Sequence, residues 1–455
     1  MKTVITYGTF DLFHDGHRNL LKRAKTLGDR LIVGVTTEQF DIQRGKMNVV
    51  DSLMRRIDSV RSCGLADEII VEEREGQKIS DIQKYDVDVI VFGSDWRGKC
   101  DYLTEYCEVV YLDRTKDISS SSLRDVRHGI VQLGIVGTGR IAGRTIEEII
   151  YVSGVNVIAV YNPKTKSAKQ FAEEHELAYS FNNYDAFLER VNAVYIASPH
   201  ETHYEYTRRA LVAGRHVLCE KPMVLSEPEA RELFELAERS NLVLMEAIKT
   251  AYAPGFINLL AIAKGGRLGK IHDVEAAFTK LVPNLPCTRE YDTKVGGSFT
   301  ELASYSLLPI IKILGTDYQD VYFDFFKDKS GVDIYAKAYF KYNGTGESIA
   351  CAKTGIGVKS EGQLLISGTG GYILVKSPWW LIKSFEVCYE NVFENESFSA
   401  PFPGYGMRYE IADFIRNINE PAARNYKLTR EDSIAIAGVI ERFLEARNLG
   451  SSHCQ

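Results

Sequence analysis

Two copies of one local pattern constrain this chain most: a short apolar strand, a glycine-containing turn and then a helix. The first copy is residues 4–7 followed by GTFDLFHDGH, with an amphipathic run over 18–26. The second is residues 131–136 followed by GTGRIA, with a helix expected over 143–152. Further apolar strands follow each copy, which is typical of parallel α/β sheets. Since 455 residues are too many for one hydrophobic core, we predict consecutive α/β domains.

The pattern changes after residue 253. Strands such as VDIYAKAYFKY and ESIACAKTGI follow with few helices between them, which favours a mostly antiparallel sheet. Helices are expected at about 298–314, 407–417 and 430–448. We therefore predict an α/β protein of three domains: a Rossmann-like domain over 1–128, a dinucleotide-binding Rossmann domain over 129–253, and an α+β domain with a mostly antiparallel open sheet over 254–455.

Composition excludes several classes of protein. A net charge of −6 gives no general attraction to nucleic acid or anionic membranes. No apolar stretch approaches the length of a membrane span, and MKTVITYGTFD lacks the pattern of a signal peptide. The eight cysteines form no CxxC pair, which favours reduced thiols and disfavours a zinc site. We expect a cytoplasmic protein that acts on small molecules.

The first turn carries two histidines where its helix begins. His14 and His17 flank Asp15-Gly16, and a helix N-terminus suits phosphate because its N–H groups and dipole are positive. Two imidazoles there can donate hydrogen bonds to a triphosphate and stabilise charge on departing pyrophosphate. On this motif alone, a turn-capping His14 and a packed His17 are about equally good explanations.

Two further segments follow in order on the same predicted sheet, FGSDWRGK and RTKDISSSSLR. Together with GTFDLFHDGH, they make residues 1–127 resemble glycerol-3-phosphate cytidylyltransferase. The resemblance implies a nucleotidyltransferase that joins CTP to an alcohol phosphate, with Mg²⁺ accompanying CTP. Asp117 stands where the family commonly has glycine, which blurs the substrate assignment. The resemblance implies catalytic roles for His14, His17 and Arg114, and nucleotide binding by Arg56, Ser119, Ser120 and Ser121. From their places in the turn, in a loop and at a strand end, we also predict nucleotide binding by Gly8, Thr9, Phe10, Lys46 and Asp95.

Lys46 and a further residue of the first turn, Asp11, each have an alternative explanation. Asp11 either helps to hold the metal ion near the phosphates or shapes the turn. Lys46, in QRGKM, either closes on phosphates or is a solvated surface lysine.

The second turn reads GxGxxA between a strand and a helix. Gly137 permits the tight turn, Gly139 lets the backbone approach a pyrophosphate, and the small Ala142 lets helix and strand pack. Asn162 ends the next strand where an NAD site usually has an acid, and Lys164 and Lys166 lie just beyond. We therefore predict NADPH rather than NADH; both lysines being merely solvated is the alternative.

A lysine and a helix pair complete this second constellation. Lys221 follows Glu220 at a strand end in CEKP, where a lysine held beside the acid can protonate a carbonyl oxygen as hydride arrives. Glu301 and Tyr305 lie four residues apart in GGSFTELASY, on one predicted helix face.

Residues 131–448 resemble the glucose–fructose oxidoreductase / inositol dehydrogenase family. Besides the motifs above, the segments IASPHETHYEYTRRAL and MEAIKTAY carry this resemblance. The resemblance implies catalysis by Lys221, with Tyr305 in the position of a family His or Tyr and Glu301 where Asp is commoner. It also implies pairing of subunits through the open sheet, so a homo-oligomer is expected. The cofactor site is predicted to include Gly137, Gly139, Arg140, Ile141, Ala142, Asn162, Lys164, Ser198, His203 and Glu220.

Three further residues have weaker assignments. His203 either lies near the nicotinamide or is structural, and His200 is expected to be structural. Trp379-Trp380 could stack a sugar or a base, but a packed core or a dimer interface is the favoured explanation.

Two catalytic constellations on one chain predict consecutive steps of one pathway. The leading hypothesis is that CTP and a ketose phosphate, fructose 6-phosphate first, give a CDP-ketose that NAD(P)H reduces to a CDP-hexitol for a surface or capsular polysaccharide. The alternative order reduces a ketose or triose phosphate first and then forms CDP-ribitol or CDP-glycerol. A hypothesis of another class makes one of the two domains a non-catalytic ligand-binding module.

Overall fold

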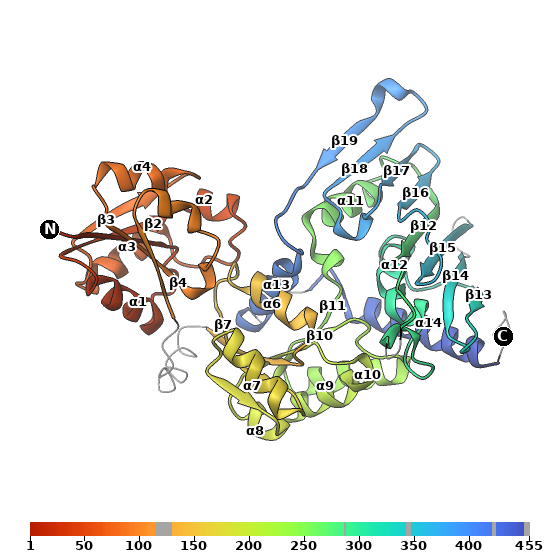
Figure 1. Ribbon diagram of the computed structural model, residues 1–455. Coiled ribbons are helices and arrows are strands. Elements are labelled where there is room, and N and C mark those ends of the chain that lie inside the picture. Colours follow the sequence, from red (N-terminus) through yellow and green to blue (C-terminus); the bar gives the residue numbers. More distant parts are fainter. Residues whose placement is uncertain (114–129, 286–287, 343–346, 421–424, 450–455) are drawn as a thin grey trace. The chain divides into compact units, whose positions relative to one another are not determined.

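Three β-sheets organise the protein, whose computed structural model describes residues 1–113, 130–285, 288–342, 347–420 and 425–449 (Figure 1). The strand orders are β3-β2-β1-β4-β5, β11-β10-β9-β6-β7-β8 and β13-β14-β15-β12-β16-β17-β18-β19. The chain divides into two compact units, Met1–Ala193 and Val194–Gln455. No helix in the described part of the chain is long and apolar enough to cross a membrane.

The N-terminal sheet is parallel throughout its pairings. Its strands are β1 Thr3–Gly8, β2 Arg30–Thr36, β3 Glu68–Glu72, β4 Val89–Gly93 and β5 Glu108–Leu112. The associated helices are α1 Asp15–Lys25, α2 Glu38–Gln43, α3 Leu53–Ser62, α4 Gln77–Lys84, and the 3₁₀ turns η1 Ser94–Trp96 and η2 Asp101–Glu105.

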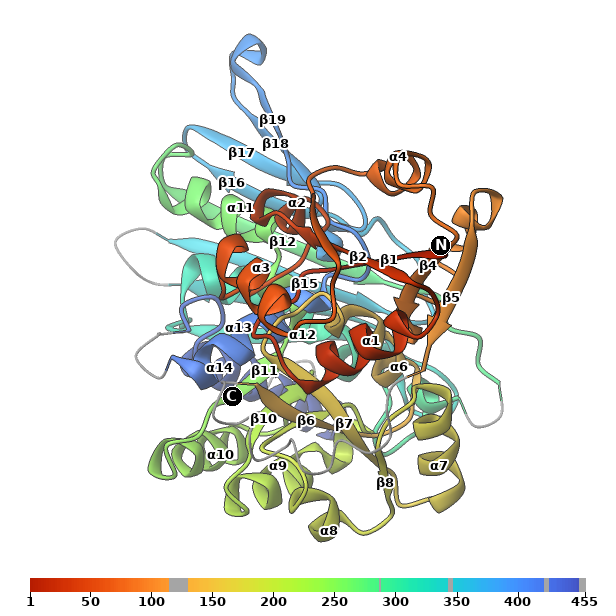
Figure 2. The ribbon, with the colours of Figure 1, turned by 90° about the vertical axis from the view of Figure 1, so that its left-hand side faces the viewer.

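Both faces of this sheet bury apolar side chains. Leu21 of α1 and Val60 of α3 pack with the alternate residues Val4, Val33 and others in one core cluster. The residues between them on the strands, Ile5 and Ile32 among them, form a second cluster with α4 and η2. Because strand side chains alternate between faces, the near-continuous apolar strands follow from burial on both sides. Figure 2 shows the strands and helices of this sheet from a second direction.

In the second sheet, β6 pairs with β7, β7 with β8 and β10 with β11, each time in parallel. Its strands are β6 Val131–Val136, β7 Val155–Tyr161, β8 Tyr179–Phe181, β9 Ala193–Ile196, β10 His216–Glu220 and β11 Leu244–Ala247. Its helices are α6 Arg140–Ile149, α7 Thr165–Glu174, α8 Tyr184–Leu188, η4 His200–Thr202, α9 His203–Val212, α10 Glu227–Arg239, η5 Lys249–Tyr252 and α11 Pro254–Lys264.

The third sheet is antiparallel except where β12 pairs with β15 in parallel. Its strands are β12 Ile271–Thr279, β13 Asp320–Lys327, β14 Asp333–Tyr342, β15 Ser348–Gly355, β16 Leu364–Gly368, β17 Gly371–Val375, β18 Ser384–Cys388 and β19 Glu396–Ser399. With it come η6 Arg289–Tyr291, α12 Ser298–Leu314, η7 Trp379–Leu381, η8 Val392–Glu394, α13 Met407–Asn419 and α14 Arg430–Leu449. The buried helix α12 packs on one face of this sheet, against β12, β14 and β15 (Figure 1).

The predicted fold class is confirmed: two parallel α/β sheets precede a mostly antiparallel one. Two helices begin earlier than the hydrophobic pattern predicts. Helix α1 begins at Asp15 rather than residue 18, because His14 caps it. Helix α6 begins at Arg140 rather than residue 143, because the glycine turn leads straight into the helix. Apolar periodicity detects only the buried face of a helix, so it misses polar first turns.

Candidate active sites

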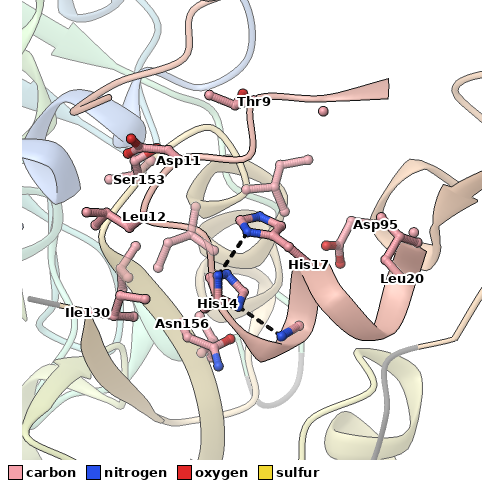
Figure 3. A pocket seen from close by; sticks show the side chains of 18 of the residues that line it. Thr9, Asp11, Leu12, His14, His17, Leu20, Asp95, Ile130, Ser153 and Asn156 are labelled. Atoms are coloured by element: carbon pink, nitrogen blue, oxygen red, sulfur yellow. Dashed lines mark hydrogen bonds between the residues drawn. The ribbon is translucent and has the colours of Figure 1, made fainter. Parts of the chain in front are cut away.

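His14 and His17 form a reciprocal cap at the start of α1. The Gly16 N–H donates to Nδ1 of His14 at 3.0 Å, and the His14 N–H lies 3.5 Å from Nδ1 of His17 (Figure 3). The two rings lie 4.0 Å apart between centroids. The helix therefore holds both imidazoles side by side before any ligand binds.

This cap determines which ring nitrogens carry protons. A nitrogen that accepts from a backbone N–H has no proton of its own, so the neutral rings are protonated at Nε2. Burial, followed by the nearby His14 and Lys46, holds the pKa of His17 well below its usual value. His17 is therefore a neutral hydrogen-bond donor at physiological pH.

The predicted nucleotide-binding residues of the first turn and of β4 line one pocket with the two histidines. Gly8, Thr9, Phe10 and Asp95 all contribute to its wall, at the carboxyl ends of β1 and β4 (Figure 3). The ring of Phe10 lies edge-on to His17, 5.4 Å away. This is the sheet edge where parallel α/β proteins bind ligands.

Asp11 has a structural partner set. Its carboxylate accepts backbone N–H bonds from Val50 and Asp51, at 3.1 and 2.8 Å, and the residue is 7% exposed. Those bonds tie the first turn to the residues just before α3. Across the described residues, no group of three or more His, Cys, Asp or Glu side chains is arranged to hold a metal ion. The contacts of Asp11 agree with the turn-shaping alternative, and its role as a ligand of Mg²⁺ bound with CTP stays a prediction.

Arg56 and Lys46 are both held by protein atoms. Arg56 is fully buried and donates to the carbonyls of Thr9 and Thr36, each at 2.8 Å. It therefore ties the first turn to the end of β2, and in this conformation its role is to position the turn. Lys46 donates to the Ile150 carbonyl at 2.8 Å, and burial lowers its pKa to about 8. Arg114, Ser119, Ser120 and Ser121 lie outside the described residues.

The second glycine turn has the geometry for a pyrophosphate. Gly137 has φ 107°, a conformation that favours glycine, and a Cβ added at Gly139 would meet no atom within 4 Å. Helix α6 begins directly afterwards at Arg140 and Ile141 and has no side-chain cap, so its first N–H groups can donate to phosphate oxygens. Ala142 is completely buried against the sheet. These residues fit a dinucleotide cofactor.

Asn162 closes the turn beside this site. Its amide nitrogen donates to Oγ1 of Thr138 at 2.8 Å, and its carbonyl oxygen accepts from the Lys164 N–H at 2.9 Å. Lys164 and Lys166 are exposed at the start of α7. A neutral side chain and two cations therefore face the region that follows β7.

Lys221, Glu301 and Tyr305 come together from two elements. Lys221, just after β10, donates from Nζ to the backbone carbonyl of Glu301 at 2.8 Å. The same ammonium lies 5.7 Å from the centroid of the Tyr305 ring. Burial keeps the pKa of Tyr305 well above its usual value, so its hydroxyl stays protonated. The arrangement places a proton donor against a helix face with a carboxyl and a phenol.

Helix α12 is anchored at its start by a buried carboxylate. Asp333 of β14 accepts from the Phe299 N–H at 2.9 Å and from the Ser298 hydroxyl at 3.0 Å. Arg447 of α14 pairs with the same carboxylate at 2.9 Å. These bonds hold the first turn of α12 on the sheet, and therefore the positions of Glu301 and Tyr305.

Glu220 differs from the expectation that it holds the Lys221 ammonium. Its carboxylate accepts from the Tyr195 hydroxyl at 2.5 Å and from the Lys221 backbone N–H at 3.3 Å. The ammonium instead bonds to Glu301. Strand β10 ends at Glu220, so Lys221 lies beyond the strand, where its ammonium reaches the Glu301 carbonyl of α12. Desolvation raises the pKa of Glu220.

The two histidines of PHETH connect the loop after β9 to its neighbours. Both ring nitrogens of the buried His203 lie 2.9 Å from backbone carbonyls, those of Pro222 and Ser198. Burial lowers its pKa to about 4, so the neutral ring donates to one carbonyl at a time. These contacts of both ring nitrogens with backbone carbonyls agree with a structural role for His203.

His200 lies next to the first turn of α12. Its Nε2 is 2.8 Å from the Val295 carbonyl, and its Nδ1 is 3.6 Å from the Glu301 carboxyl. Burial lowers its pKa to about 4, so the ring is neutral at physiological pH. The packing thus brings His200 to Glu301, a neighbour that its place in the sequence does not reveal.

Comparisons with known proteins agree with the N-terminal geometry. Residues 5–126 match the family described as cytidylyltransferase-like. The glycerol-3-phosphate cytidylyltransferase of Bacillus spizizenii is 53% identical over 124 residues, 27% of this chain and 95% of that protein. The enzyme of the same name from Bacillus subtilis is 45% identical over 130 residues, 29% of this chain and all of that protein. The chain belongs to the cytidylyltransferase-like family.

A second segment of the chain matches another family. Residues 131–248 match the oxidoreductase family with an NAD-binding Rossmann fold. The scyllo-inositol 2-dehydrogenase (NADP⁺) of Bacillus subtilis is 26% identical over 324 residues, 69% of this chain and 95% of that protein. The protein is therefore a fusion of a cytidylyltransferase and an NAD(P)-dependent oxidoreductase, and a bifunctional enzyme.

Solved structures give the fold of the oxidoreductase part. Levoglucosan dehydrogenase, in complex with NADH and levoglucosan, is similar with a TM-score of 0.63 and 15% identity over 70% of this chain and 98% of that one. A 3-ketoreductase from Actinomadura kijaniata, in complex with TDP-benzene and NADP, has a TM-score of 0.59 and 22% identity over 69% of this chain and 96% of that one.

Sequence reasoning missed two residues of these two sites, Arg44 and Tyr195. Arg44 lines the cytidylyltransferase pocket and pairs with the buried Asp41. Arg44 lies in the same QRGKM segment as Lys46, so the sequence could have marked it as a second candidate for phosphate binding. Tyr195, which holds Glu220, lies in an apolar strand where only burial would have been expected.

Proposed function

We propose that the enzyme makes a CDP-alditol in two steps. CTP and a ketose phosphate, fructose 6-phosphate first among candidates, give a CDP-ketose and pyrophosphate, and NADPH then reduces the ketose to a CDP-hexitol. The product is an activated polyol of the kind that a surface or capsular polysaccharide requires. The observation that carries the proposal is the presence on one chain of two preorganised donor sets, the Nε2–H groups of His14 and His17 and the ammonium of Lys221.

In the first step a phosphate oxygen of the sugar phosphate attacks the α-phosphorus of CTP. The bond to the bridging oxygen breaks, and pyrophosphate leaves with its electron pair. The neutral His14 and His17 donate hydrogen bonds to phosphate oxygens, which stabilises the charge that develops on the leaving group. No proton has to be removed from the attacking phosphate.

In the second step the open-chain ketone is the acceptor, and bound NADPH supplies the hydride. The turn at Gly137 and Gly139 and the uncapped start of α6 bind the pyrophosphate of the cofactor. The ammonium of Lys221 donates its proton to the carbonyl oxygen as this oxygen gains charge. The carbonyl of Glu301 and the ring of Tyr305 hold that ammonium in place. Asn162, Lys164 and Lys166 favour NADPH, because none of them repels a 2′-phosphate.

The alternative order reduces a ketose or triose phosphate first and cytidylylates the polyol phosphate afterwards. The N-terminal relatives, which carry the name glycerol-3-phosphate cytidylyltransferase, favour it. Two solved proteins with the oxidoreductase fold favour reduction of a nucleotide-linked sugar. One is named UDP-N-acetylglucosamine 3-dehydrogenase, and the other was solved with TDP-benzene.

Mass spectrometry of the products tests the proposal. The enzyme is incubated with fructose 6-phosphate, ribulose 5-phosphate or dihydroxyacetone phosphate, with CTP alone, NADPH alone or both. We expect a CDP-ketose with CTP alone and a product 2 mass units heavier with both, since reduction adds two hydrogens. Reduction of the ketose phosphate by NADPH alone would establish the reversed order. Absence of either activity from every mixture would make one domain a binding module.

A further inference from the structure

An open cleft lies beside the catalytic helix and has no part in the sites above. Its volume is about 670 Å³. It lies at the end of β12 and beside η7, and its walls include Phe278, Lys280, Lys359, Ser377 and Trp380. A cleft of this size accommodates a ligand as large as a nucleotide.

A run of rings connects this cleft, here called the Trp380 cleft, to the proton donor. The ring of Tyr305, which Lys221 contacts, lies 5.4 Å from the ring of Phe278. Phe278 in turn stacks on Trp380, with centroids 3.7 Å apart and planes 7° from parallel. These three rings form part of a packed apolar cluster between Lys221 and the cleft. A substrate that reaches both places therefore has to pass over the surface of this cluster.

The two adjacent tryptophans have different surroundings. Trp379 is completely buried, and its indole N–H donates to the Ala277 carbonyl at 2.9 Å, which agrees with the packed-core explanation. Trp380 is only half-buried and lines the cleft. An aromatic ring on a cleft wall offers a π-face or edge to any nucleobase, and such contacts are tolerant of base identity.

Two lysines add positive charge to this aromatic wall. Lys359 is exposed and donates to the Thr279 carbonyl at 2.8 Å, which leaves two of its three protons for a ligand. No carboxylate in the described part of the chain lies within 4 Å of its Nζ. Lys280 is also exposed, although Glu290 at 3.7 Å partly neutralises it. A free sugar needs no cation, whereas a diphosphate needs at least one.

We propose that the Trp380 cleft binds the nucleoside diphosphate half of a nucleotide-linked sugar, with the base against Trp380 and the diphosphate beside Lys359 and Lys280. The inference rests on the proposed function and deepens it: the reductase then takes the CDP-sugar, and cytidylylation comes first. The sugar extends from the diphosphate past Phe278 to the ammonium of Lys221.

Equilibrium dialysis with radiolabelled CDP tests the site without turnover, using the full chain and saturating NADP⁺ to fill the cofactor site. We expect two CDP molecules per chain, one of them in the cytidylyltransferase pocket. Trp380→Ala and Lys359→Ala should each remove one and leave the other. Lys264→Ala, which changes an exposed lysine at the end of α11, should retain both. Trp380→Phe should restore the second molecule if the wall acts through its ring.

Steady-state kinetics tests the same site during reduction. Lys359→Ala should raise KM for the CDP-ketose about 10- to 100-fold, the worth of a charge-assisted hydrogen bond, with kcat changed less than about twofold. Lys359→Arg should restore most of the loss. KM for an unactivated ketose phosphate should not change.

The outcomes separate the two proposals. One CDP per chain in the wild type, or two that persist in Trp380→Ala and Lys359→Ala, overturns the cleft assignment even if the enzyme makes a CDP-hexitol. A second CDP that both variants lose, without reduction of any CDP-ketose, supports the cleft and contradicts the proposed substrate instead.

Discussion

The cytidylyltransferase and oxidoreductase sites of this enzyme are assembled in different ways. His14 and His17 belong to one helix start, and bonds within four consecutive residues orient both rings. Lys221 is held instead by Glu301, 80 positions along the chain, and helix α12 is itself anchored by Asp333 and Arg447. A site built from one turn can be recognised from its local motif. A site built from several elements depends on packing that no local motif records.

The largest expected effect is on the oxidoreductase site. Lys221→Ala removes the proton donor, so reduction should slow about 10²–10⁴-fold, the usual worth of a positioned general acid. Cytidylyltransfer should continue at the wild-type rate, and the unreduced CDP-ketose should accumulate. Product analysis by mass spectrometry measures both.

Lys264→Ala is the matched control for that variant, because it removes an exposed lysine of the same unit. Reduction at the wild-type rate in Lys221→Ala would show that another group supplies the proton. Accumulation of free, unreduced sugar phosphate would show that reduction comes first.

The corresponding change in the local site is His17→Ala. Loss of one preorganised donor should slow pyrophosphate release from CTP about 10²–10³-fold. Reduction of a supplied CDP-ketose should be unaffected. Because the ring acts as a neutral donor from Nε2, His17→Gln should recover part of the rate, whereas His17→Phe should not. Coupled pyrophosphate detection measures the rate, and equal damage to both activities in a folded variant would refute the division between the sites.

A buried acid near Lys221 adds a pH dependence of stability to the oxidoreductase part of the chain. Glu246 is 3% exposed, and burial raises its pKa from 4.5 to about 7. The folded state then holds a proton that the unfolded chain loses above pH 4.5. This group's contribution to stability is therefore fully present below pH 4.5 and is lost as the pH rises through 7, by on the order of 3 kcal/mol.

Glu246→Gln cannot ionise and should remove that dependence. Urea unfolding of both proteins at pH 5 and pH 7.5 measures it: the variant should gain stability relative to the wild type at the higher pH. A relative stability that does not change between the two values would mean that Glu246 stays charged in the folded protein.

The smallest expected effect concerns the cofactor. We expect a higher kcat/KM with NADPH than with NADH, and Asn162→Asp should shift the ratio toward NADH about 10-fold, since like charges repel at a 2′-phosphate. The change preserves shape: an Asp can still accept from the Lys164 N–H and from the Thr138 hydroxyl. Initial rates with both cofactors measure the ratio. A wild type that prefers NADH would contradict the assignment of Lys164 and Lys166.

Much of the architecture could be predicted because it depends on nearest neighbours in the sequence. The alternation of apolar strands and helices predicts two parallel sheets, since both faces of such strands are buried. The turns GTFDLFHDGH and GTGRIA locate both ligand edges, because a strand, a glycine turn and a helix start are contiguous in the chain. His14, His17, Gly137 and Gly139 were identifiable for that reason.

Tertiary structure alone decided what the distant partners do. Nothing in the sequence around Arg56 shows that its guanidinium is fully buried against the Thr9 and Thr36 carbonyls. The motif CEKP places Glu220 beside Lys221, but Glu220 accepts from Tyr195 at the end of β10, and the Glu301 carbonyl of α12 holds the ammonium. Likewise, Trp379 and Trp380 are equivalent in sequence, and only the packing buries one and leaves the other on a cleft wall. Sequence order determines which residues share a turn, whereas contacts between elements determine which side chains meet.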